Sequence, residues 1–263
     1  LVPSVQSELS VQIPVEDFKQ ALSQILFAVA TNESRPELTG VSFQFFLHNS
    51  EGRLTMAATD SYRLAEATIP VVSSISEPMS VVVPAKTLSE TNRILSIFRD
   101  DVELPSSLTM SVSGSQIVFL YGPVELISRT IDGQYPDYRQ IIPSHFQTHT
   151  LIDREDFIKA VRTASLFSKN GIFDVSLGFD PDTKQLCVSA TDATRGQNQS
   201  KCSADVSGQA NTVAVNYRYL LDGLQAMTSD QVVFEMIDPG NPCLLTPKGT
   251  TEGYRYIVMP IKQ

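Results

Sequence analysis

The chain repeats itself, and this repeat restricts the possible folds more than any other feature of the sequence. Residues 13–21 read IPVEDFKQA and residues 152–160 read IDREDFIKA, an offset of 152 − 13 = 139 residues. Two more matches follow in the same order at an offset of 132: ATD at residues 58–60 and 190–192, then VPAKTL at residues 83–88 and VNYRYL at residues 215–220. Matches that keep their order and nearly their spacing indicate two copies of one structural module.

Each copy has the pattern of an α+β module. In residues 15–30 apolar side chains recur at helical spacing, and the repeated EDF segments predict a matching helix in the second copy. The segments that begin at residues 83 and 215 each predict a second helix. The expected strands are residues 40–47, 52–58, 79–83, 107–112, 116–121 and 124–130, then 175–179, 185–190, 209–215, 231–237, 243–247 and 255–259. Runs of strands between turn signals predict antiparallel sheets with two helices packed on each copy.

The length of 263 residues suits two domains of about 130 residues each. The sequence turns polar over residues 143–150, so the expected domains are residues 1–143 and 144–263. No apolar run approaches the ~18 residues that a membrane-spanning helix needs. Three scattered cysteines, Cys187, Cys202 and Cys243, form no disulfide framework and are typical of reduced thiols in a cytoplasmic protein.

The acidic balance bears on possible partners. With 20 basic and 29 acidic residues the net charge is −9, which taken alone argues against a nucleic-acid-binding protein. Binding depends on where the positive charges lie, however, and a protein that encircles DNA needs them only on its inner wall. Composition therefore leaves this question open.

The sequence offers little for catalysis. Asp60 and Asp192 occupy equivalent positions in two separate modules, where capping of a turn is the expected role. His48, His145 and His149 have no metal-ligand spacing, so we expect no metal site and no cofactor. A phosphate-binding glycine loop and a nucleophile elbow are also missing from the sequence. An enzyme would require both aspartates to meet in one cleft.

Two segments suggest a binding role. Residues 131–143, IDGQYPDYRQIIP, combine tyrosines, prolines and isoleucines. They fit a stiff interdomain connector or an apolar ledge for a partner peptide. Residues 256–263, YIVMPIKQ, end the chain with a closing strand followed by an apolar segment that a protein would hide or use.

Four segments together resemble the signature segments of the bacterial DNA polymerase III β subunit, the β sliding clamp. They are residues 35–41 (RPELTGV), 58–65 (ATDSYRLA), 135–138 (YPDY) and 256–260 (YIVMP). They occur in the family's order and extend over nearly the whole chain. The family has three similar domains per subunit, so the resemblance implies that this chain begins at the second and lacks the first.

The resemblance implies two tandem copies of the DNA-clamp module in a ring that closes head to tail around duplex DNA. Such a ring holds replicative polymerase on its template by topology and needs no base-specific contact. The implied partners are duplex DNA, replicative polymerase, clamp loader, repair polymerases and mismatch-repair proteins, in the cytoplasm and near the nucleoid. The cations implied to face DNA are Lys19, Arg35, Lys86, Arg93, Arg154, Lys159, Arg162 and Arg218.

By the same resemblance, a pocket for short partner peptides lies between the two domains. Its implied residues are Leu38, Thr59, Ser61, Tyr62, Arg63, Leu64, Pro136, Ile141, Asn216, Tyr219, Ile257, Val258, Met259, Pro260 and Ile261. Ser61 and Tyr62 stand where the family often has Gly-His, and residues 261–263 lack the frequent Met-Arg-Leu ending. These departures bear on peptide preference.

The subunit interface that the resemblance implies includes Leu166 and Phe167. Residues 194–200 carry none of the acids that the family often has there. Two alternatives remain open from the residues themselves: an interaction scaffold without a DNA role, which the acidic balance suits, and an enzyme that uses Asp60 or Asp192.

Overall fold

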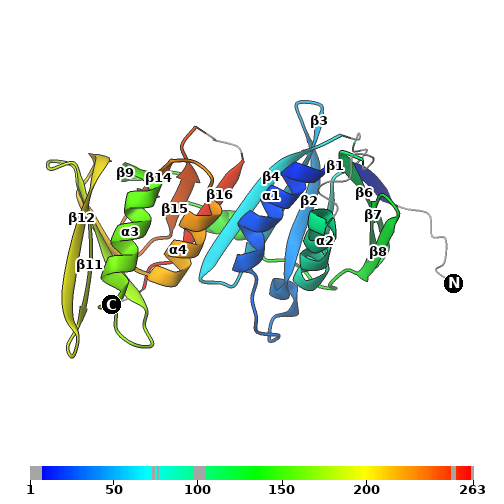
Figure 1. Cartoon of the computed structure of the whole chain (residues 1–263). Coiled ribbons are helices and arrows are strands. Elements are labelled where there is room, and N and C mark those ends of the chain that lie inside the picture. Colours follow the sequence, from blue (N-terminus) through cyan, green and yellow to red (C-terminus); the bar gives the residue numbers. More distant parts are fainter. Residues whose placement is uncertain (1–7, 73–74, 76, 98–104, 250–252, 262–263) are drawn as a thin grey trace. The chain divides into compact units, whose positions relative to one another are not determined.

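The computed structural model describes residues 8–72, 75, 77–97, 105–249 and 253–261. The chain forms two compact units. The first contains residues 1–61 and 65–136, and the second contains residues 62–64 and 137–263. Figure 1 labels their elements. None of the described helices is both long and apolar enough to span a membrane.

The first unit contains two four-stranded sheets. One has the order β1-β6-β7-β8 and the other β4-β3-β2-β5. The helices α1 and α2 contact each other, and both lie against the second sheet (Figure 1). The elements are β1 (Leu9–Pro14), α1 (Val15–Ile25), η1 (Leu26–Ala28), η2 (Pro36–Thr39), β2 (Gly40–His48), β3 (Glu51–Thr59), β4 (Arg63–Val71), β5 (Met79–Pro84), α2 (Ala85–Ile97), β6 (Ser107–Ser113), β7 (Gln116–Tyr121) and β8 (Val124–Arg129).

The second unit has the same chain path. Its strands follow the orders β13-β10-β11-β12 and β9-β14-β15-β16, and β12 also pairs with β9. The elements are η3 (Tyr138–Ile141), β9 (Thr148–Asp153), α3 (Arg154–Ser165), β10 (Asp174–Asp180), β11 (Gln185–Asp192), β12 (Gly196–Gly208), β13 (Asn211–Asn216), α4 (Tyr217–Ala226), β14 (Gln231–Met236), β15 (Cys243–Pro247) and β16 (Tyr254–Val258). Each strand of this unit takes the place of one in the first, which confirms the predicted repeat and the α+β class.

The long strand β12 pairs with two neighbouring strands. Residues 196–203 pair with β11, and residues 204–208 pair with β9. Figure 1 shows β11 and β12 extending together well beyond the other strands of the unit. Along this strand Cys202, Ala204 and Val206 are buried, and the side chains between them are exposed.

The structure differs from the sequence-based prediction at equivalent places in both units. Four strands were not predicted: β1, β4, β9 and β12. In place of one helix over residues 15–30, α1 ends at Ile25 and a 3-10 turn follows. The polar stretch over residues 143–150 runs into β9 at Thr148, and residue 143 lies within the second unit.

The phenylalanine of the EDF repeat organises both cores. In the first unit Phe18 packs at 6.2 Å between ring centres on each of Phe43 and Phe119. In the second unit Phe157 packs on Phe234 at 6.3 Å. Both repeat phenylalanines are fully buried, and burial of such a side chain stabilises a fold by about 1.5–3 kcal/mol. The repeated sequence therefore marks the contact between helix and sheet.

A glycine sets the distance between α4 and the neighbouring strand β16. A Cβ atom at Gly223 would lie 2.2 Å from the ring of Tyr256. The ring is completely buried, so it has no open space into which to move. The missing side chain at residue 223 allows the helix to lie directly on the tyrosine ring.

Candidate functional site

An arginine of the second unit is held between an acid and an aromatic ring. Arg63 Nη1 lies 2.5 Å from Asp222 Oδ2, and the Arg63 guanidinium carbon lies 4.5 Å from the centre of the Tyr219 ring. The Arg63 side chain is 11% exposed and that of Asp222 is 44% exposed. Asp222 follows Tyr219 by three residues on α4, so both project from one face of the helix. The ion pair and the cation–π contact together fix the guanidinium on that face.

Tyr62 adds a second ring, which is open to solvent. Its ring lies 6.5 Å from that of Tyr219 with an angle of 24° between the planes, and the residue is 63% exposed. Its carbonyl oxygen accepts a hydrogen bond of 2.9 Å from the Met259 amide. Tyr62, Arg63, Tyr219 and Asp222 are called the Arg63 cluster below. An exposed aromatic ring beside a charged pair is suited to bind a partner's side chain.

The sequence positions α4 under this cluster. The Asn216 side chain caps the helix by accepting a hydrogen bond of 2.9 Å from the Arg218 amide. The Tyr256 hydroxyl donates to the Tyr219 carbonyl oxygen at 2.7 Å. The first turn of the helix is thus bonded to the last residue of β13 and to β16.

The C-terminal segment is bonded to the strand that leads into α4. Pro260 forms a bridge with Val215, and the Ile261 amide donates to the Ala214 carbonyl oxygen at 2.8 Å. Met259, between this bridge and β16, is half-buried. The apolar ending noted in the sequence is therefore held beside the Arg63 cluster by backbone hydrogen bonds.

A buried tyrosine hydroxyl lies near the same arginine. Tyr254 is 3% exposed, and its hydroxyl has no hydrogen-bond partner among the described residues. Burial raises the pKa of Tyr254 well above its usual value, while the nearby charge of Arg63 acts in the opposite direction. The hydroxyl is therefore neutral over the whole physiological range.

Four of the candidate pocket residues belong to the first unit. The Thr59 amide donates to the Tyr135 hydroxyl at 3.1 Å, and Thr59 Oγ1 accepts from the Ser61 amide at 3.1 Å. Ser61 has φ = +78°, a conformation that favours glycine. Leu38 is buried and Pro136 is half-buried.

Other candidates are distributed between core and surface. Leu64, Ile257 and Val258 are buried, whereas Ile141 is 40% exposed. Sequence reasoning did not single out Asp222, whose ion-pair partner Arg63 lies 159 positions away in the chain. The second unit thus brings Tyr62 and Arg63 together with α4 and the C-terminal segment.

Most of the cations named from the sequence lie beside acidic side chains or aromatic rings. Lys19 is buried and lies 3.2 Å from Glu16. Arg218 lies over the Phe173 ring at 3.6 Å, while Lys86 and Arg162 are exposed. The other ion pairs are Arg35–Glu37 at 2.9 Å, Arg93–Glu90 at 2.5 Å, Arg154–Glu155 at 3.3 Å and Lys159–Asp156 at 3.3 Å.

The candidate interface residues lie just beyond the end of α3. Leu166 is 67% exposed and Phe167 is half-buried. Arg195 ties this segment to the turn before β12, because its guanidinium donates to the carbonyl oxygens of Leu166 and Ser168 and to the Asn170 side chain. The apolar pair is therefore presented by a cross-linked loop.

Asp192 caps the turn between β11 and β12, as predicted from the sequence. Its Oδ1 atom accepts hydrogen bonds from the amides of Thr194 at 2.9 Å and Arg195 at 3.1 Å. Its Oδ2 atom lies 3.1 Å from the Arg195 guanidinium. The hydrogen bond from the Thr194 side chain is the largest of several that hold the pKa of Asp192 well below its usual range. This carboxylate stabilises a turn.

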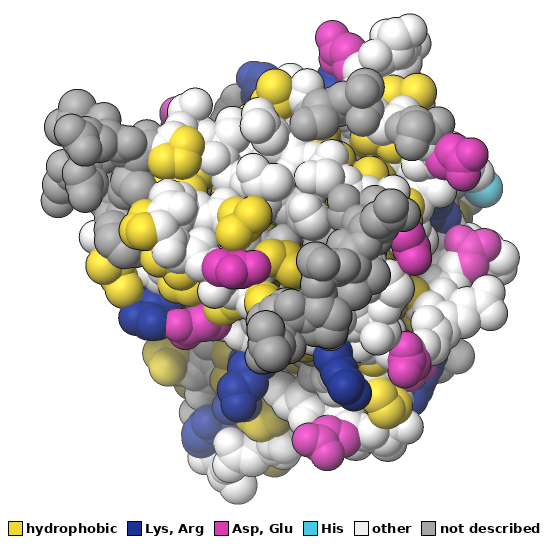
Figure 2. All heavy atoms as spheres, turned by 90° about the vertical axis from the view of Figure 1, so that its right-hand side faces the viewer, with side chains coloured by type: hydrophobic (Ala, Val, Ile, Leu, Met, Phe, Trp, Pro, Cys, Tyr) yellow, Lys and Arg dark blue, Asp and Glu magenta, His cyan; other side chains and the backbone are white. Residues whose placement is uncertain are grey.

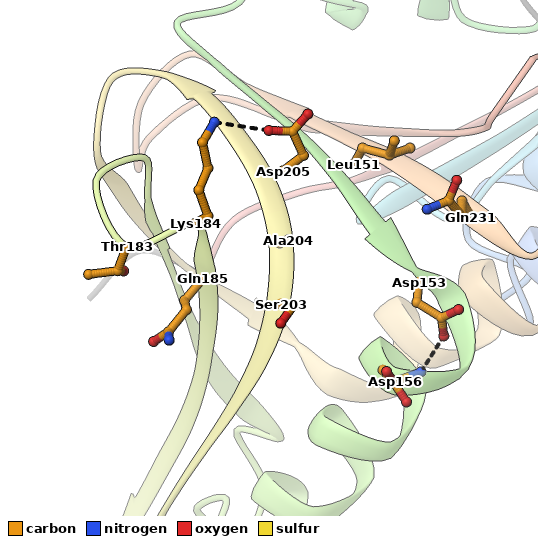
Figure 3. Close-up of a pocket in the computed structure, with 10 residues that line it drawn as sticks. All are labelled: Leu151, Asp153, Asp156, Thr183, Lys184, Gln185, Ser203, Ala204, Asp205 and Gln231. Atoms are coloured by element: carbon orange, nitrogen blue, oxygen red, sulfur yellow. Dashed lines mark hydrogen bonds and ion pairs between the residues drawn. The ribbon is translucent and has the colours of Figure 1, made fainter.

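A groove of about 580 Å³ lies at the junction of β12 and β9 (Figure 3). The Lys184 ammonium lies 2.9 Å from Asp205, and Asp153 caps α3 through the Asp156 amide. The three aspartates of the lining outnumber its single lysine, so the groove does not suit an anion. It is lined by Leu151, Asp153, Asp156, Thr183, Lys184, Gln185, Ser203, Ala204, Asp205 and Gln231.

Within the described ranges, no group of three or more His, Cys, Asp and Glu side chains could hold a metal ion. Burial raises the pKa of Cys202 to about 11 and that of Cys243 to about 12. Both thiols therefore remain protonated at neutral pH, which does not suit a nucleophile.

In Figure 2, the described acidic, basic and hydrophobic side chains of one face are interspersed.

Two family models together match nearly the whole chain. The model for the central domain of the DNA polymerase III beta subunit matches residues 12–137, and the model for the C-terminal domain of the same subunit matches residues 139–262. The chain belongs to the DNA polymerase III β subunit family. Both modules of the chain therefore match domains of this family, as the resemblance implied.

Relatives of this chain include the beta sliding clamps of Staphylococcus aureus, 32% identical over 264 residues, and Staphylococcus epidermidis, 30% identical over 263. Each match covers all of this chain and 66% of the relative's length. The solved Bacillus subtilis sliding clamp is 27% identical with a TM-score of 0.89, and the match covers 100% of this chain and 67% of that one. The Bartonella birtlesii clamp, solved with griselimycin bound, has the same identity and TM-score, with 100% and 68% covered.

Proposed function

We propose that this chain acts in DNA replication as part of a sliding clamp, a processivity factor that encircles duplex DNA and tethers polymerase. Its membership of the β subunit family supports the proposal, as do the names of its relatives. The chain spans about 66% of the length of those relatives, so ring formation by the whole protein is part of what we propose. The two units would act as successive domains of that ring.

The peptide-binding role rests mainly on one observation, the exposed Tyr62 ring beside the Arg63–Asp222 pair. An exposed aromatic side chain beside a fixed ion pair is typical of a site that binds a few apolar side chains of a short peptide segment. We propose that the second unit's Tyr62, Arg63, Tyr219 and Met259 line such a site. The residues named for it from the first unit remain candidates.

The partners that we propose for this site are replicative polymerase, clamp loader, repair polymerases and mismatch-repair proteins. A clamp bound with griselimycin among the solved relatives supports a ligand site in this family. We further propose that the chain has no catalytic activity of its own and works in the cytoplasm. Asp192 favours this, because it is engaged in a turn.

The test is fluorescence anisotropy of a labelled Gln-x-x-Leu-Phe peptide titrated with the chain and with Tyr62→Ala. Tyr62 is mostly exposed, so its truncation leaves the core intact. We expect saturable binding that weakens about tenfold, the effect of losing an anchor of about 1.4 kcal/mol. The matched control is Leu166→Ala, which truncates an equally exposed apolar residue and should bind like the unmodified chain.

Failure of the unmodified chain to bind would remove the peptide-tethering role. Equal weakening by both substitutions would indicate nonspecific apolar adsorption instead. The alternative of an interaction scaffold without a DNA role is favoured by the ion pairs of the helix cations Lys19, Arg93 and Lys159. Retention of the assembled ring on circular but not linear DNA would decide for the clamp.

A further inference from the structure

The loop between α3 and β10 contains the only Asn-Gly pair of the sequence, Asn170 and Gly171. Both residues are exposed, and Gly171 has φ = +85°. Asparagine is a thermolabile residue, because the nitrogen of the following peptide bond can attack its side-chain amide carbon. A following glycine favours this attack, since it has no Cβ atom to obstruct the approach.

The backbone nitrogen that would attack is not engaged elsewhere. Among the described residues, the Gly171 amide has no hydrogen-bond acceptor. The next two amides, of Ile172 and Phe173, donate to the Lys169 carbonyl oxygen at 3.3 and 3.2 Å. A Cβ atom built at Gly171 would meet no atom within 4 Å beyond its chain neighbours, so the space around this nitrogen is open.

The carbonyl group that would be attacked is polarised by a cation. Arg195 Nη2 lies 3.2 Å from Asn170 Oδ1. The attack places negative charge on this oxygen, and a positively charged donor that already contacts the oxygen stabilises that charge as it develops. The guanidinium is held in place by its other bonds, to the carbonyl oxygens of Leu166 and Ser168 and to Asp192. Arg195 is therefore oriented toward the reacting oxygen by contacts that do not involve Asn170.

We propose that Asn170 is a site of spontaneous deamidation and that Arg195 promotes the reaction. The Gly171 nitrogen loses its proton to hydroxide and forms a bond to Asn170 Cγ, while the Cγ–Nδ2 bond breaks and the departing NH2 group takes up a proton and leaves as ammonia. Water then opens the resulting succinimide ring at either of its carbonyl carbons. The products are aspartate at residue 170 and isoaspartate, in which the main chain continues through Cγ. Water is the only co-reactant.

The modification would change both the charge and the length of the loop. The carboxyl group of either product is ionised at neutral pH, so Arg195 would then lie beside two carboxylates, that of residue 170 and that of Asp192. Isoaspartate also adds one atom to the main chain between Lys169 and Phe173, whose hydrogen bond spans the Asn-Gly pair. The same loop carries the exposed Leu166, so the surface that it presents would change as the protein ages.

The experiment follows the purified chain at 37 °C and neutral pH over several weeks. Tryptic peptides are analysed by mass spectrometry, which detects the replacement of NH2 by OH and separates the aspartate and isoaspartate forms. The same measurement is made on Asn170→Gln, on Arg195→Gln and on a free synthetic peptide of residues 166–175. Asn32, which is exposed and precedes a glutamate, is the control within the same chain.

We expect Asn170 in the folded chain to deamidate at least as fast as in the free peptide or within about tenfold of that rate, because exposed loops have little protection. Asn32 and the glutamine of Asn170→Gln should stay unmodified over the same time. Arg195→Gln should slow the reaction at Asn170 about threefold or more, a modest effect because Asp192 neutralises part of the charge. Arg195→Lys, which keeps a positive charge, should have a rate between these two.

A rate in the folded chain more than about tenfold below that of the free peptide would overturn the proposal, because the fold would then protect the pair. An unchanged or higher rate in Arg195→Gln would overturn the role assigned to Arg195. Circular dichroism verifies that each variant is folded, and Arg195→Met replaces Arg195→Gln if the latter is not. None of these outcomes depends on the function proposed above.

Discussion

Two residues near the Arg63 cluster have local features that lower the stability of the fold. Ser61 has a positive φ angle directly before the exposed Tyr62. Tyr254 buries a hydroxyl that has no hydrogen-bond partner among the described residues. Both features are unfavourable locally, and unfavourable local features often accompany binding sites.

Replacement of Ser61 by glycine should stabilise the chain by about 0.5–1 kcal/mol, since glycine adopts φ = +78° without the steric cost that a side chain carries. The free energy of unfolding from urea titration measures this. Ser61→Val should have the opposite effect, because a β-branched side chain is less tolerant of positive φ. Equal stability of the two variants would contradict the assigned backbone strain.

Tyr254 and Tyr256 lie two residues apart on β16, and we expect Tyr→Phe to affect stability differently at the two positions. Tyr254→Phe should leave stability unchanged or raise it by up to about 1 kcal/mol, because it removes a buried hydroxyl that lacks a partner among the described residues. Tyr256→Phe should lower stability by about 1 kcal/mol, because it deletes the 2.7 Å hydrogen bond to Tyr219. Thermal unfolding of both variants checks the pair, and a larger loss at residue 254 would reverse the interpretation.

At the scale of elements, the close approach of α4 to β16 depends on one missing side chain. Gly223→Ala should destabilise the second unit by about 1–3 kcal/mol, since its Cβ would lie 2.2 Å from the buried Tyr256 ring. Alanine forms helices better than glycine by about 1 kcal/mol, which works against this loss. Gln225→Ala, at an exposed position of the same helix, is the control and should be neutral or slightly stabilising. A more stable Gly223→Ala would show that α4 can shift freely.

The contribution of the turn between β11 and β12 to stability should decrease at acidic pH. The pKa of Asp192 is lowered in the folded chain, so its contribution to stability is present above the unfolded value of about 3.9 and is lost as the pH falls through the folded value. The difference in urea midpoint between the unmodified chain and Asp192→Ala should therefore be larger at pH 7 than at pH 3. Thr194→Ala, which removes a donor to the same carboxylate, should show part of this pH dependence. A constant difference would rule out the assigned role of the carboxylate.

The four strands that were not predicted from the sequence differ in the signal that they carry. β12 carries the run GQNQSKCSADVSG, whose exposed face is nearly all polar and whose buried face holds small residues. β1 and β9 are short strands directly before a helix, and β4 follows the turn at Ser61. The burial of β1 and β9 alternates along the strand, so these two strands carried a signal in the sequence. In β12 the propensity is weak, and pairing with its neighbours decides the conformation.

At the scale of the whole molecule, the repeat could be predicted because its matching residues lie in the core, where Phe18 and Phe157 hold equivalent places. Tyr62, Arg63 and Tyr219 could be named from the sequence as well, through the family's motifs. Asp222 could not, because an ion pair between residues 159 positions apart leaves no local pattern. The 3-10 turn after α1 was likewise unpredictable, since the apolar spacing continues through it.

The net charge of −9 predicts weak binding of this 263-residue chain to DNA. Arg93, Lys159 and other helix cations form ion pairs with neighbouring acidic side chains. We therefore expect a dissociation constant above about 1 µM for a linear 30-base-pair duplex at physiological salt. Anisotropy of a labelled duplex across a salt series measures both the affinity and its slope. Submicromolar binding with a slope of about −4 or steeper would show that at least four phosphates are neutralised despite those ion pairs.

The long strand β12 also limits how such a chain can change length during evolution. Its two halves pair with different neighbours, β11 and β9, so deletion of one residue within the strand would put one half out of register with its neighbour. The buried side chains of that half would then exchange places with their exposed neighbours. Insertions and deletions among homologues should therefore gather in the turns at residues 181–184 and 193–195, while the length of β12 stays constant.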